Sequence, residues 1–389
     1  MIRMHLPVKR LTQEPKHHFF GYFDKFCYDR SGRYLLAHEI DFTARQPQPG
    51  EKAGICLADL ENDCRSRRIA ESDAWCWQQG CMLQWLNDSA TKIIYNAREG
   101  NGFVSRILDI ATGERQTLCR PVYCLSQDGR WALSLNFSRL DRERPGYGYP
   151  GGNDPNAGID SPEDEGIWLV DLQHNTARLI ISVAQVTRAF HRPSMDHTPG
   201  WFNHLLFSPD SRRFAFFHRW RVWGENGEKK HITHMFTTNL DGSEIYPLNL
   251  EDMSSHYVWI DNSRIINFSN RHATGWQYHL FTDRTDRVEI IAKDVFPGDG
   301  HCSYSPDGRW MLTDSYPGAD ECRNLYLYQL TDGTAYEIGK FHSDCSYPIP
   351  TRCDLHPRWS RDGRKVCFDS THEGSRQIYE IDLKPITNP

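Results

Sequence analysis

The sequence has no long apolar run and no excess of basic charge. No segment approaches the ~20 consecutive apolar residues that a membrane-spanning helix needs, although 39% of the 389 residues are hydrophobic. The formal net charge is -6 at pH 7, whereas a nucleic-acid-binding domain usually carries a basic surface. We therefore expect a protein with neither a membrane nor a nucleic-acid partner.

The cysteines lack the spacing of a metal-binding finger or of a disulfide scaffold. Twelve are present, but no C-x-x-C occurs, and residues such as Cys27, Cys56, Cys124 and Cys367 lie in strand-like apolar segments. A free cysteine in such a position packs as a small hydrophobic residue. Residues 1–7 also lack the apolar segment of a secretion signal, so we expect a cytoplasmic protein.

A repeated pattern of two apolar segments around a tight turn dominates the chain. In 301–312 the turn lies at Asp307-Gly308, and such dipeptides supply the positive φ angles that hairpins require. Seven copies occur, at 26–36, 83–94, 124–133, 204–216, 256–266, 301–312 and 356–368. A long-period repeat of this kind is typical of propeller blades.

A second apolar strand, ending in a polar turn, follows each hairpin, as in 108–113. Together they predict four antiparallel strands per repeat, which make one blade. The sequence thus predicts an all-β, seven-bladed β-propeller as a single domain over residues 1–389. Residues 8–12 resemble the outermost strand at 177–181, so we expect the N-terminal strand to complete the last blade and close the ring.

One segment interrupts the repeat. Residues 139–166 are rich in glycine, proline and aspartate, with arginine and tyrosine interspersed. A long insertion of this composition is either a solvated linker or a functional loop. We expect a loop without regular structure, and its arginines and tyrosines suit a loop over the mouth of the ring.

The innermost strands of a propeller line its central channel, so the residues that start them converge. Five of these seven strands begin with histidine, although the chain has only 18 histidines. The expected residues around the channel are His18, Tyr22, Trp77, Gln79, Tyr123, His204, His256, His301, Arg352, Asp354 and His356. Such imidazoles are either metal ligands or hydrogen-bonded structural residues.

Two histidines and a carboxylate make a metal site chemically reasonable. His301 and His356 come from neighbouring blades, and Asp354 lies beside the second of them. Imidazole ligands suit several divalent transition metals. Cys302 and Cys353 flank these residues and are second-choice ligands, because adjacent residues in a strand point to opposite faces.

Arg219 and Arg221 lie two residues apart in the fourth repeat. Alternate residues share one face of a strand, and arginine recognises carboxylates through paired hydrogen bonds. Solvated side chains are the usual interpretation of such a pair. Their place near the predicted mouth favours a role in ligand binding.

Several of these motifs resemble the oligogalacturonate lyases. The resemblance rests on 18–22 with 27–32, on 255–259, on 300–303 and on 356–374, and it extends over nearly the whole chain as a blade pattern. Ulvan lyases and other propeller lyases are similar in outline. The resemblance implies a seven-bladed propeller that cleaves a uronate-containing oligosaccharide by metal-assisted β-elimination.

Carried over residue by residue, the resemblance implies specific roles. His256 corresponds to the catalytic histidine of the family, and the segment with Arg219 and Arg221 corresponds to its catalytic arginine. His301 and His356 correspond to metal ligands. Asp354 stands where the family has a third histidine, and a threonine stands near the place of its glutamine ligand. The implied cofactor is a divalent metal, with Mn, Zn and Ca as candidates.

For the reaction, we expect His256 to act as the base, with His204 or Tyr22 as the alternative base or as the proton donor. We expect His18, Tyr22, Gln79, Tyr123 and Arg352 to bind substrate. The alternative is a non-catalytic propeller of the TolB or WD-repeat type that binds a protein or glycan. A hydrolase is disfavoured because the sequence has no Gly-x-Ser-x-Gly motif.

Overall fold

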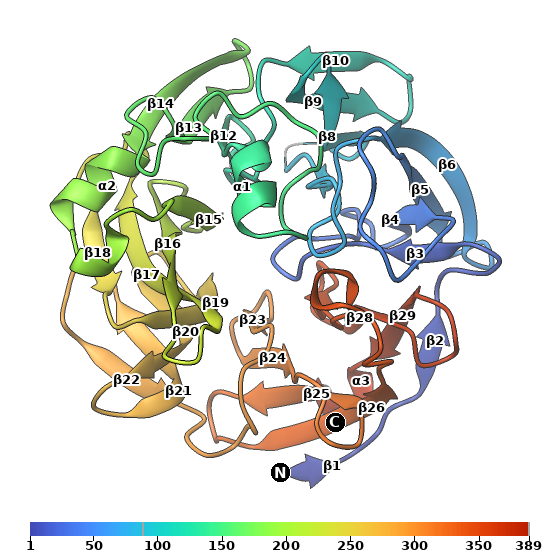
Figure 1. Ribbon diagram of the computed structural model, residues 1–389. Coiled ribbons are helices and arrows are strands. Elements are labelled where there is room, and N and C mark those ends of the chain that lie inside the picture. Colours follow the sequence, from blue (N-terminus) through green and yellow to red (C-terminus); the bar gives the residue numbers. More distant parts are fainter. Residues whose placement is uncertain (88, 388–389) are drawn as a thin grey trace.

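The computed structural model describes residues 1–87 and 89–387. In this part of the chain the strands form seven sheets, arranged as blades around a central axis (Figure 1). The four strands common to every blade run antiparallel to their neighbours, and the first strand of each repeat lies nearest the axis. The predicted seven-bladed β-propeller with four antiparallel strands per blade is therefore confirmed.

The first three blades follow the chain order without crossovers. They contain β3 (His17–Phe19), β4 (Tyr34–Ile40), β5 (Ala53–Asp59), β6 (Arg65–Ser72), β7 (Gln84–Trp85), β8 (Lys92–Glu99), β9 (Gly102–Asp109), β10 (Arg115–Leu118), β11 (Cys124–Leu125), β12 (Trp131–Ser134), β13 (Gly166–Asp171) and β14 (Thr176–Ser182).

The remaining blades repeat this arrangement, and the last takes one strand from the N-terminal segment. Their strands are β15 (Trp201–Phe207), β16 (Arg213–Trp223), β17 (Lys229–Asn239), β18 (Tyr246–Asn249), β19 (Met253–Trp259), β20 (Arg264–Arg271), β21 (Gly275–Thr282), β22 (Val288–Ile291), β23 (Ser303–Tyr304), β24 (Trp310–Asp314), β25 (Cys322–Gln329), β26 (Ala335–His342), β27 (Arg358–Trp359), β28 (Lys365–Ser370) and β29 (Gln377–Asp382).

The repeated turns have a common hydrogen-bonding pattern. In the sixth blade the Ser305 hydroxyl donates to Asp307 Oδ1 at 2.6 Å and accepts from the Trp310 backbone N–H at 3.0 Å. Gly308 follows with φ of 70°, a conformation that is costly for residues with a side chain. Serine and aspartate stabilise turns by such side-chain bonds, which explains why the Ser-x-Asp-Gly sequence recurs.

The N-terminal segment closes the ring as predicted. β2 (Val8–Arg10) pairs antiparallel with β29, with Val8 opposite Ile381, and so becomes the outermost strand of the last blade. β1 (Ile2–Arg3) adds a parallel fifth strand to the sixth blade, with Ile2 opposite Tyr336. The sequence did not indicate this second pairing, because a two-residue strand has no detectable periodicity.

The insertion at 139–166 is not the irregular loop that we expected. It begins in α1 (Phe137–Glu143), and the Asn136 side chain caps this helix by accepting from the Arg139 backbone N–H at 3.0 Å. Phe137 stacks on Tyr149, with ring centroids 4.4 Å apart, so the segment has an apolar core of its own. Glycine and proline concealed this short helix in the sequence.

The other helices are short. They are α2 (Val183–Ala189), η1 (Pro193–Met195), η2 (Ile349–Thr351) and α3 (Lys384–Thr387). Among the described residues, no helix has the length and apolar character needed to cross a membrane. The site described below is formed by inner strands and by the segments that lead into them, with α1 beside the central opening (Figure 1).

Candidate functional site

Imidazoles from four blades meet at the axis around Tyr22. The ring centroids of His256 and His301 are 4.1 Å apart, and those of His301 and His356 are 4.4 Å apart. Tyr22 lies 5.0 Å from His356 and 5.1 Å from His204. All five side chains are buried. The structure thus brings together four of the histidines that the sequence placed at the starts of inner strands.

Irregular backbone occurs at three of these histidines. β15 shifts register between Asn203 and Leu206, and β19 shifts between Ser254 and Tyr257. A bulge re-aims side chains and is common next to active sites. His204 and His356 also adopt φ angles of 51° and 43°. Such left-handed conformations in residues other than glycine are strained and concentrate at functional sites.

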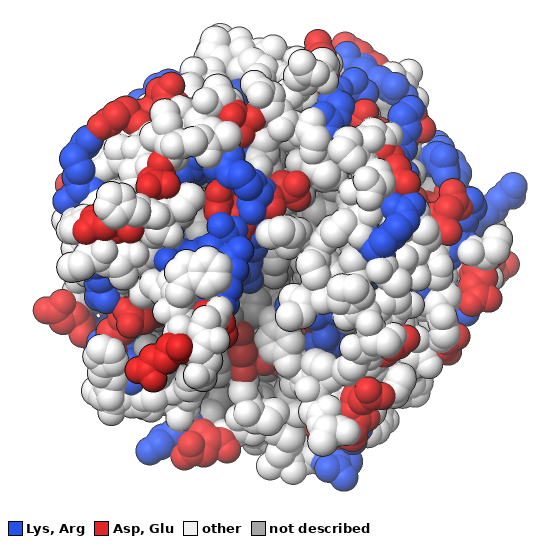
Figure 2. Space-filling view, in the orientation of Figure 1, with Lys and Arg blue, Asp and Glu red and all other residues white. Residues whose placement is uncertain are grey.

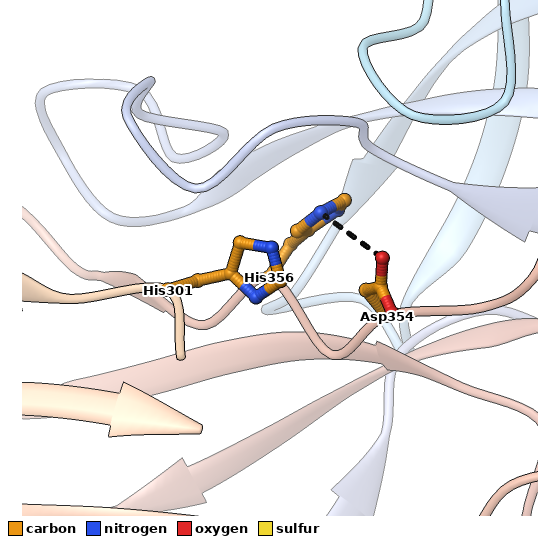
Figure 3. A group of neighbouring side chains, drawn as sticks. All are labelled: His301, Asp354 and His356. Atoms are coloured by element: carbon orange, nitrogen blue, oxygen red, sulfur yellow. Dashed lines mark ion pairs between the residues drawn. The ribbon is translucent and has the colours of Figure 1, made fainter. Parts of the chain in front are cut away.

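His301, His356 and Asp354 form a possible metal site (Figure 3). One ligand atom from each lies within 4.8 Å of the others. The Asp314 carboxylate accepts from His301 Nδ1 at 2.9 Å, which leaves His301 Nε2 free. Both ring nitrogens of His356 are buried without a hydrogen-bond partner. A carboxylate behind a ligating histidine is the usual support of a metal ligand.

The Asp354 carboxylate already pairs with two arginines. Arg323 Nη2 lies 2.8 Å from Asp354 Oδ1, and Arg352 Nε donates to the same carboxylate at 2.9 Å. Burial would raise the pKa of Asp354, but these guanidinium groups lower it to about 2. Two imidazoles and an ionised carboxylate fit a divalent cation, which would share Asp354 with Arg323 and Arg352.

Cys302 and Cys353 lie outside this ligand group. Cys302 packs in an apolar cluster with Ile266 and Met311. Burial raises the pKa of the Cys302 thiol above its usual range and that of Cys353 to about 11. The second-choice assignment of both cysteines as ligands therefore has no place in the His301, Asp354 and His356 group.

Asp299 pairs with His256 and was not singled out from the sequence. Its Oδ1 lies 3.0 Å from His256 Nδ1, and Ser255 Oγ donates to Oδ2 at 2.5 Å. Burial lowers the pKa of His256, although Asp299 acts in the opposite direction. The neutral ring therefore has Nδ1 held by Asp299 and Nε2 free. The sequence gave no signal for Asp299, because an aspartate between glycines is ordinary in turns.

The two arginines of β16 differ in their surroundings. Arg219 is 3% exposed, and its Nε and Nη1 atoms have no hydrogen-bond partner. Burial and the charge of Arg144 lower the pKa of Arg219 to about 9. Arg221 instead pairs with Glu143 at 2.5 Å, at the end of α1. Arg219 thus remains available for a ligand, whereas Arg221 attaches the insertion to β16.

The side chains expected to bind substrate are mostly engaged within the protein. His18 Nδ1 lies 3.1 Å from Gln377 Oε1, between the first and last blades. The Tyr123 hydroxyl donates to Asn203 at 3.1 Å and accepts from Gln79 Nε2 at 2.7 Å. These contacts join neighbouring blades. They explain the polar residues at these positions without a ligand.

Tyr22 and Arg352, the other two expected substrate-binding residues, lie at the centre. The Tyr22 hydroxyl is 3.4 Å from His204 Nε2, and burial raises the pKa of this phenol well above its usual value. Arg352 stacks 5.1 Å above the ring of Tyr316 and holds Asp354. A protonated phenol and a neutral imidazole thus lie in one buried group.

The space-filling view gives the charge distribution around this centre. Figure 2 shows the face hollowed near its middle, with Lys and Arg side chains gathered on the side where Figure 1 places α1. The arrangement therefore combines neutral imidazoles, a possible cation site and an unpaired guanidinium. These groups can remove a proton from a bound anion and stabilise the negative charge that develops.

A comparison of the sequence with models of protein families gives no match, and a comparison with curated protein sequences gives none. The structure is similar to an oligogalacturonate lyase from Vibrio parahaemolyticus, with a TM-score of 0.68, 18% identity and coverage of 97% of this chain and 94% of that one. An oligogalacturonate lyase in complex with manganese gives a TM-score of 0.68, 17% identity and coverage of 97% and 93%.

The same architecture occurs in proteins of other activities. The β-propeller domain of the Trilobed protease from Pyrococcus furiosus matches with a TM-score of 0.54, 11% identity and coverage of 94% of this chain and 95% of that one. At these identities the comparisons establish a shared propeller fold, and the function must be argued from the site.

Proposed function

We propose that this protein is a lyase that cleaves a uronate-containing oligosaccharide by β-elimination, and that it is related to the oligogalacturonate lyases. The observation that carries the proposal is the His256–Asp299 pair, in which His256 lies against the buried group of His301, His356 and Asp354. The structural likeness to two oligogalacturonate lyases supports it.

β-Elimination removes the proton α to the uronate carboxylate and then expels the 4-O substituent. The proton is only weakly acidic, so negative charge that develops on the carboxylate must be stabilised. A cation or a guanidinium can do this: His301, Asp354 and His356 could hold the cation, and Arg219 has unpartnered guanidinium nitrogens. A neutral imidazole with a pKa near the working pH is a suitable base.

We assign the base to His256. Asp299 accepts from Nδ1, so the lone pair of Nε2 is free to take the proton. This hydrogen bond fixes the ring orientation and stabilises the imidazolium that forms. His204 has no such carboxylate; burial together with the charge of Arg219 lowers its pKa well below the usual value. His204 is therefore the weaker candidate for the base.

We assign the proton donor to Tyr22. Its phenol is protonated at neutral pH because burial raises its pKa, and it lies among His204, His256 and His356. The departing 4-oxygen needs a proton as its bond to carbon breaks. The Tyr22 hydroxyl can supply one and can later recover it from solvent through the nearby imidazoles.

His301, His356 and Asp354 would hold a divalent cation, for which Mn, Zn and Ca are the candidates. When bound, such an ion acts as a Lewis acid toward a carboxylate oxygen. Manganese is present in one of the structurally similar lyases. In this chain, Asp314 orients His301, while Arg323 and Arg352 keep the Asp354 carboxylate ionised.

A non-catalytic binding propeller is the second candidate, and the likeness to a protease propeller domain favours it. One experiment distinguishes the lyase from the binding propeller. The protein is incubated with a panel of uronate glycans, with and without divalent metals, and the ultraviolet absorbance of an unsaturated product is followed. We expect product formation by the native protein. His256→Gln should abolish it, and the exposed His272→Gln should not.

Absence of product with every glycan and metal would refute the lyase assignment. Unchanged turnover by His256→Gln would remove this residue from the role of base. Thermal unfolding of both variants checks that the fold is retained, since His256 is buried and His272 is exposed.

A further inference from the structure

We infer that Cys27 and Cys367 are a disulfide-forming pair, and that their oxidation joins the first blade to the last and closes the propeller ring covalently. The two sulfur atoms lie 3.0 Å apart, although 340 positions separate the residues in the chain. Cys27 precedes Tyr28, which bridges to Leu35 of β4 in the first blade, and Cys367 belongs to β28 of the last. The inference concerns the ring itself and does not rest on the proposed lyase activity.

The first support is the geometry of the two thiols. Both side chains are fully buried, and both belong to the core cluster that the first and last blades share. A disulfide bond is about 2.05 Å long, so the sulfurs need to approach by only about 1 Å to form one. Close packing on all sides holds them in this position.

The second support is the place of the pair, at the junction where the ring closes. Around it, Arg358 of β27 donates to the Gly21 carbonyl at 3.3 Å, and the Phe20 backbone N–H donates to the Asp369 carboxylate at 3.3 Å. These hydrogen bonds join segments from the two ends of the chain. A covalent bond at the same place would tie the ends together and restrict the unfolded chain.

The third support is the guanidinium beside Cys367. Arg358 lies directly opposite Cys367 in the pairing of β27 with β28. Its Nη2 atom pairs with Asp369 at 2.6 Å, whereas its Nε atom is buried without a hydrogen-bond partner. Burial would raise the pKa of Cys367, but the hydrogen bond from Cys27 and the charge of Arg358 lower it. Because the thiolate is the reactive form of cysteine, we expect Cys367 to react first with an oxidant.

The oxidation removes two electrons, and we assign the role of oxidant to hydrogen peroxide. The Cys367 sulfur attacks a peroxide oxygen, so that a sulfur–oxygen bond forms and the oxygen–oxygen bond breaks; the departing hydroxide takes the thiol proton and becomes water. The Cys27 sulfur then attacks the Cys367 sulfur. The sulfur–oxygen bond breaks, and hydroxide leaves with the Cys27 proton as water. Two thiols and one peroxide thus give one disulfide and two waters.

The burial of both thiols determines how fast this reaction proceeds. Peroxide reaches Cys367 only when the first and last blades separate transiently, because neither sulfur is open to solvent in the closed ring. We therefore expect slow oxidation of the folded protein. The disulfide, once formed, should resist reduction for the same reason.

The test uses the full chain with Cys119→Ser, Cys322→Ser and Cys345→Ser, which remove the cysteines that are not buried. The protein is incubated with hydrogen peroxide and sampled over time, alkylated in denaturant, digested without reductant and analysed by mass spectrometry. We expect two peptides joined through Cys27 and Cys367, and their separation by dithiothreitol in denaturant. The melting temperature should rise by about 5 °C on oxidation, because the bond closes a very long loop.

Two single variants complete the design. Cys27→Ala should remove both the cross-link and the rise in melting temperature. Cys124→Ala, which removes another buried cysteine from the third blade, should keep both. If Cys27→Ala does not fold, the peptide analysis of the protein that retains both cysteines still decides the inference.

Three results would overturn the inference. The first is the absence of the Cys27–Cys367 link after prolonged oxidation, including oxidation of Cys367 to a sulfinic acid without a link. The second is a link between other cysteines in its place. The third is an equal rise in melting temperature in Cys27→Ala, or no rise in the cross-linked protein, since neither agrees with covalent closure of the ring.

Discussion

At the residue scale, the candidate chemistry depends on pairs of side chains that fix proton positions. Asp299 holds His256 Nδ1 at 3.0 Å, and Asp314 holds His301 Nδ1 at 2.9 Å. In both pairs the second ring nitrogen is left for its proposed task, proton transfer in one case and metal ligation in the other. In the proposed mechanism, the same arrangement of carboxylate and imidazole prepares one histidine as a base and the next as a ligand.

Asp299→Asn tests the first pair. The substitution keeps the size of the side chain and removes the charge that stabilises the imidazolium, so we expect kcat to fall about 100-fold. The measurement is the initial rate of unsaturated product formation at saturating substrate. Ser255→Ala, which removes only the hydroxyl that supports Asp299, should have a smaller effect. Full activity of Asp299→Asn would contradict a supporting role for this carboxylate.

Asp314→Asn tests the second pair. Loss of the carboxylate behind His301 should weaken binding of a divalent metal about 10–100-fold, and His356→Ala should weaken it further. Equilibrium dialysis with manganese or zinc gives the dissociation constants. His342→Ala, which removes an exposed imidazole from the same blade as His301, is the control. Equal metal affinity in all four proteins would show that these residues do not form the metal site.

At the scale of elements, the insertion attaches to the ring through charged contacts. Glu143 at the end of α1 pairs with Arg221 of β16 at 2.5 Å and with Arg142 at 2.7 Å. The Gly146 carbonyl accepts from the backbone N–H of Gln78 at 3.4 Å. These bonds connect α1 and its following turn to the second and fourth blades. They therefore position Arg144 and Tyr147 at the centre.

Asp141 in α1 is held at a cost to stability. Burial raises its pKa from 3.8 to about 6. The pKa of Asp141 is higher in the folded state than in the unfolded state, so ionisation of this carboxyl destabilises the fold. The destabilisation grows as the pH rises between the two pKa values and is complete above pH 6. Asp141→Asn should therefore raise the free energy of unfolding by about 1–2 kcal/mol at neutral pH, after allowance for partial exposure.

Denaturant unfolding at several pH values measures this effect. The gain should disappear at about pH 3.5, where the carboxyl is protonated in both the folded and the unfolded states. Asp286→Asn, at an exposed position, should change stability little at any pH. A gain that does not depend on pH would mean that the amide stabilises α1 for some other reason.

At the scale of the molecule, the first strands close the ring by hydrogen bonds to its last two blades. β2 completes the last blade, and Leu11, which follows β2, is fully buried. Closure of this kind leaves few free strand edges. The central histidines come from separate blades, so their geometry depends on this closure.

Removal of residues 1–10 should lower the melting temperature and the free energy of unfolding by a few kcal/mol, because the last blade loses its outermost strand. Removal of residues 1–4, which takes away the exposed β1 and the partly buried Met4, should have a smaller effect. Calorimetry compares the two proteins. Equal stability of both would mean that β2 contributes little to closure.

The sequence by itself determined the blade number, the turns and the closing strand. These features depend on local chemistry: serine, aspartate and glycine at fixed offsets specify a turn, and alternating apolar residues specify a strand. It also indicated that His204, His256, His301 and His356 start inner strands. The ring then brings them together, because each inner strand faces the same axis.

Only the tertiary structure decided which side chains act together. It paired Asp299 with His256, committed Arg221 to Glu143, left Arg219 unpartnered and folded part of the insertion into α1. No sequence spacing specifies these contacts, because each joins segments whose separation is set by blade packing and by bulges. The direction in which each side chain points at the axis, and its distance from the side chains of other blades, depend on the closed ring. The sequence pattern therefore cannot specify them.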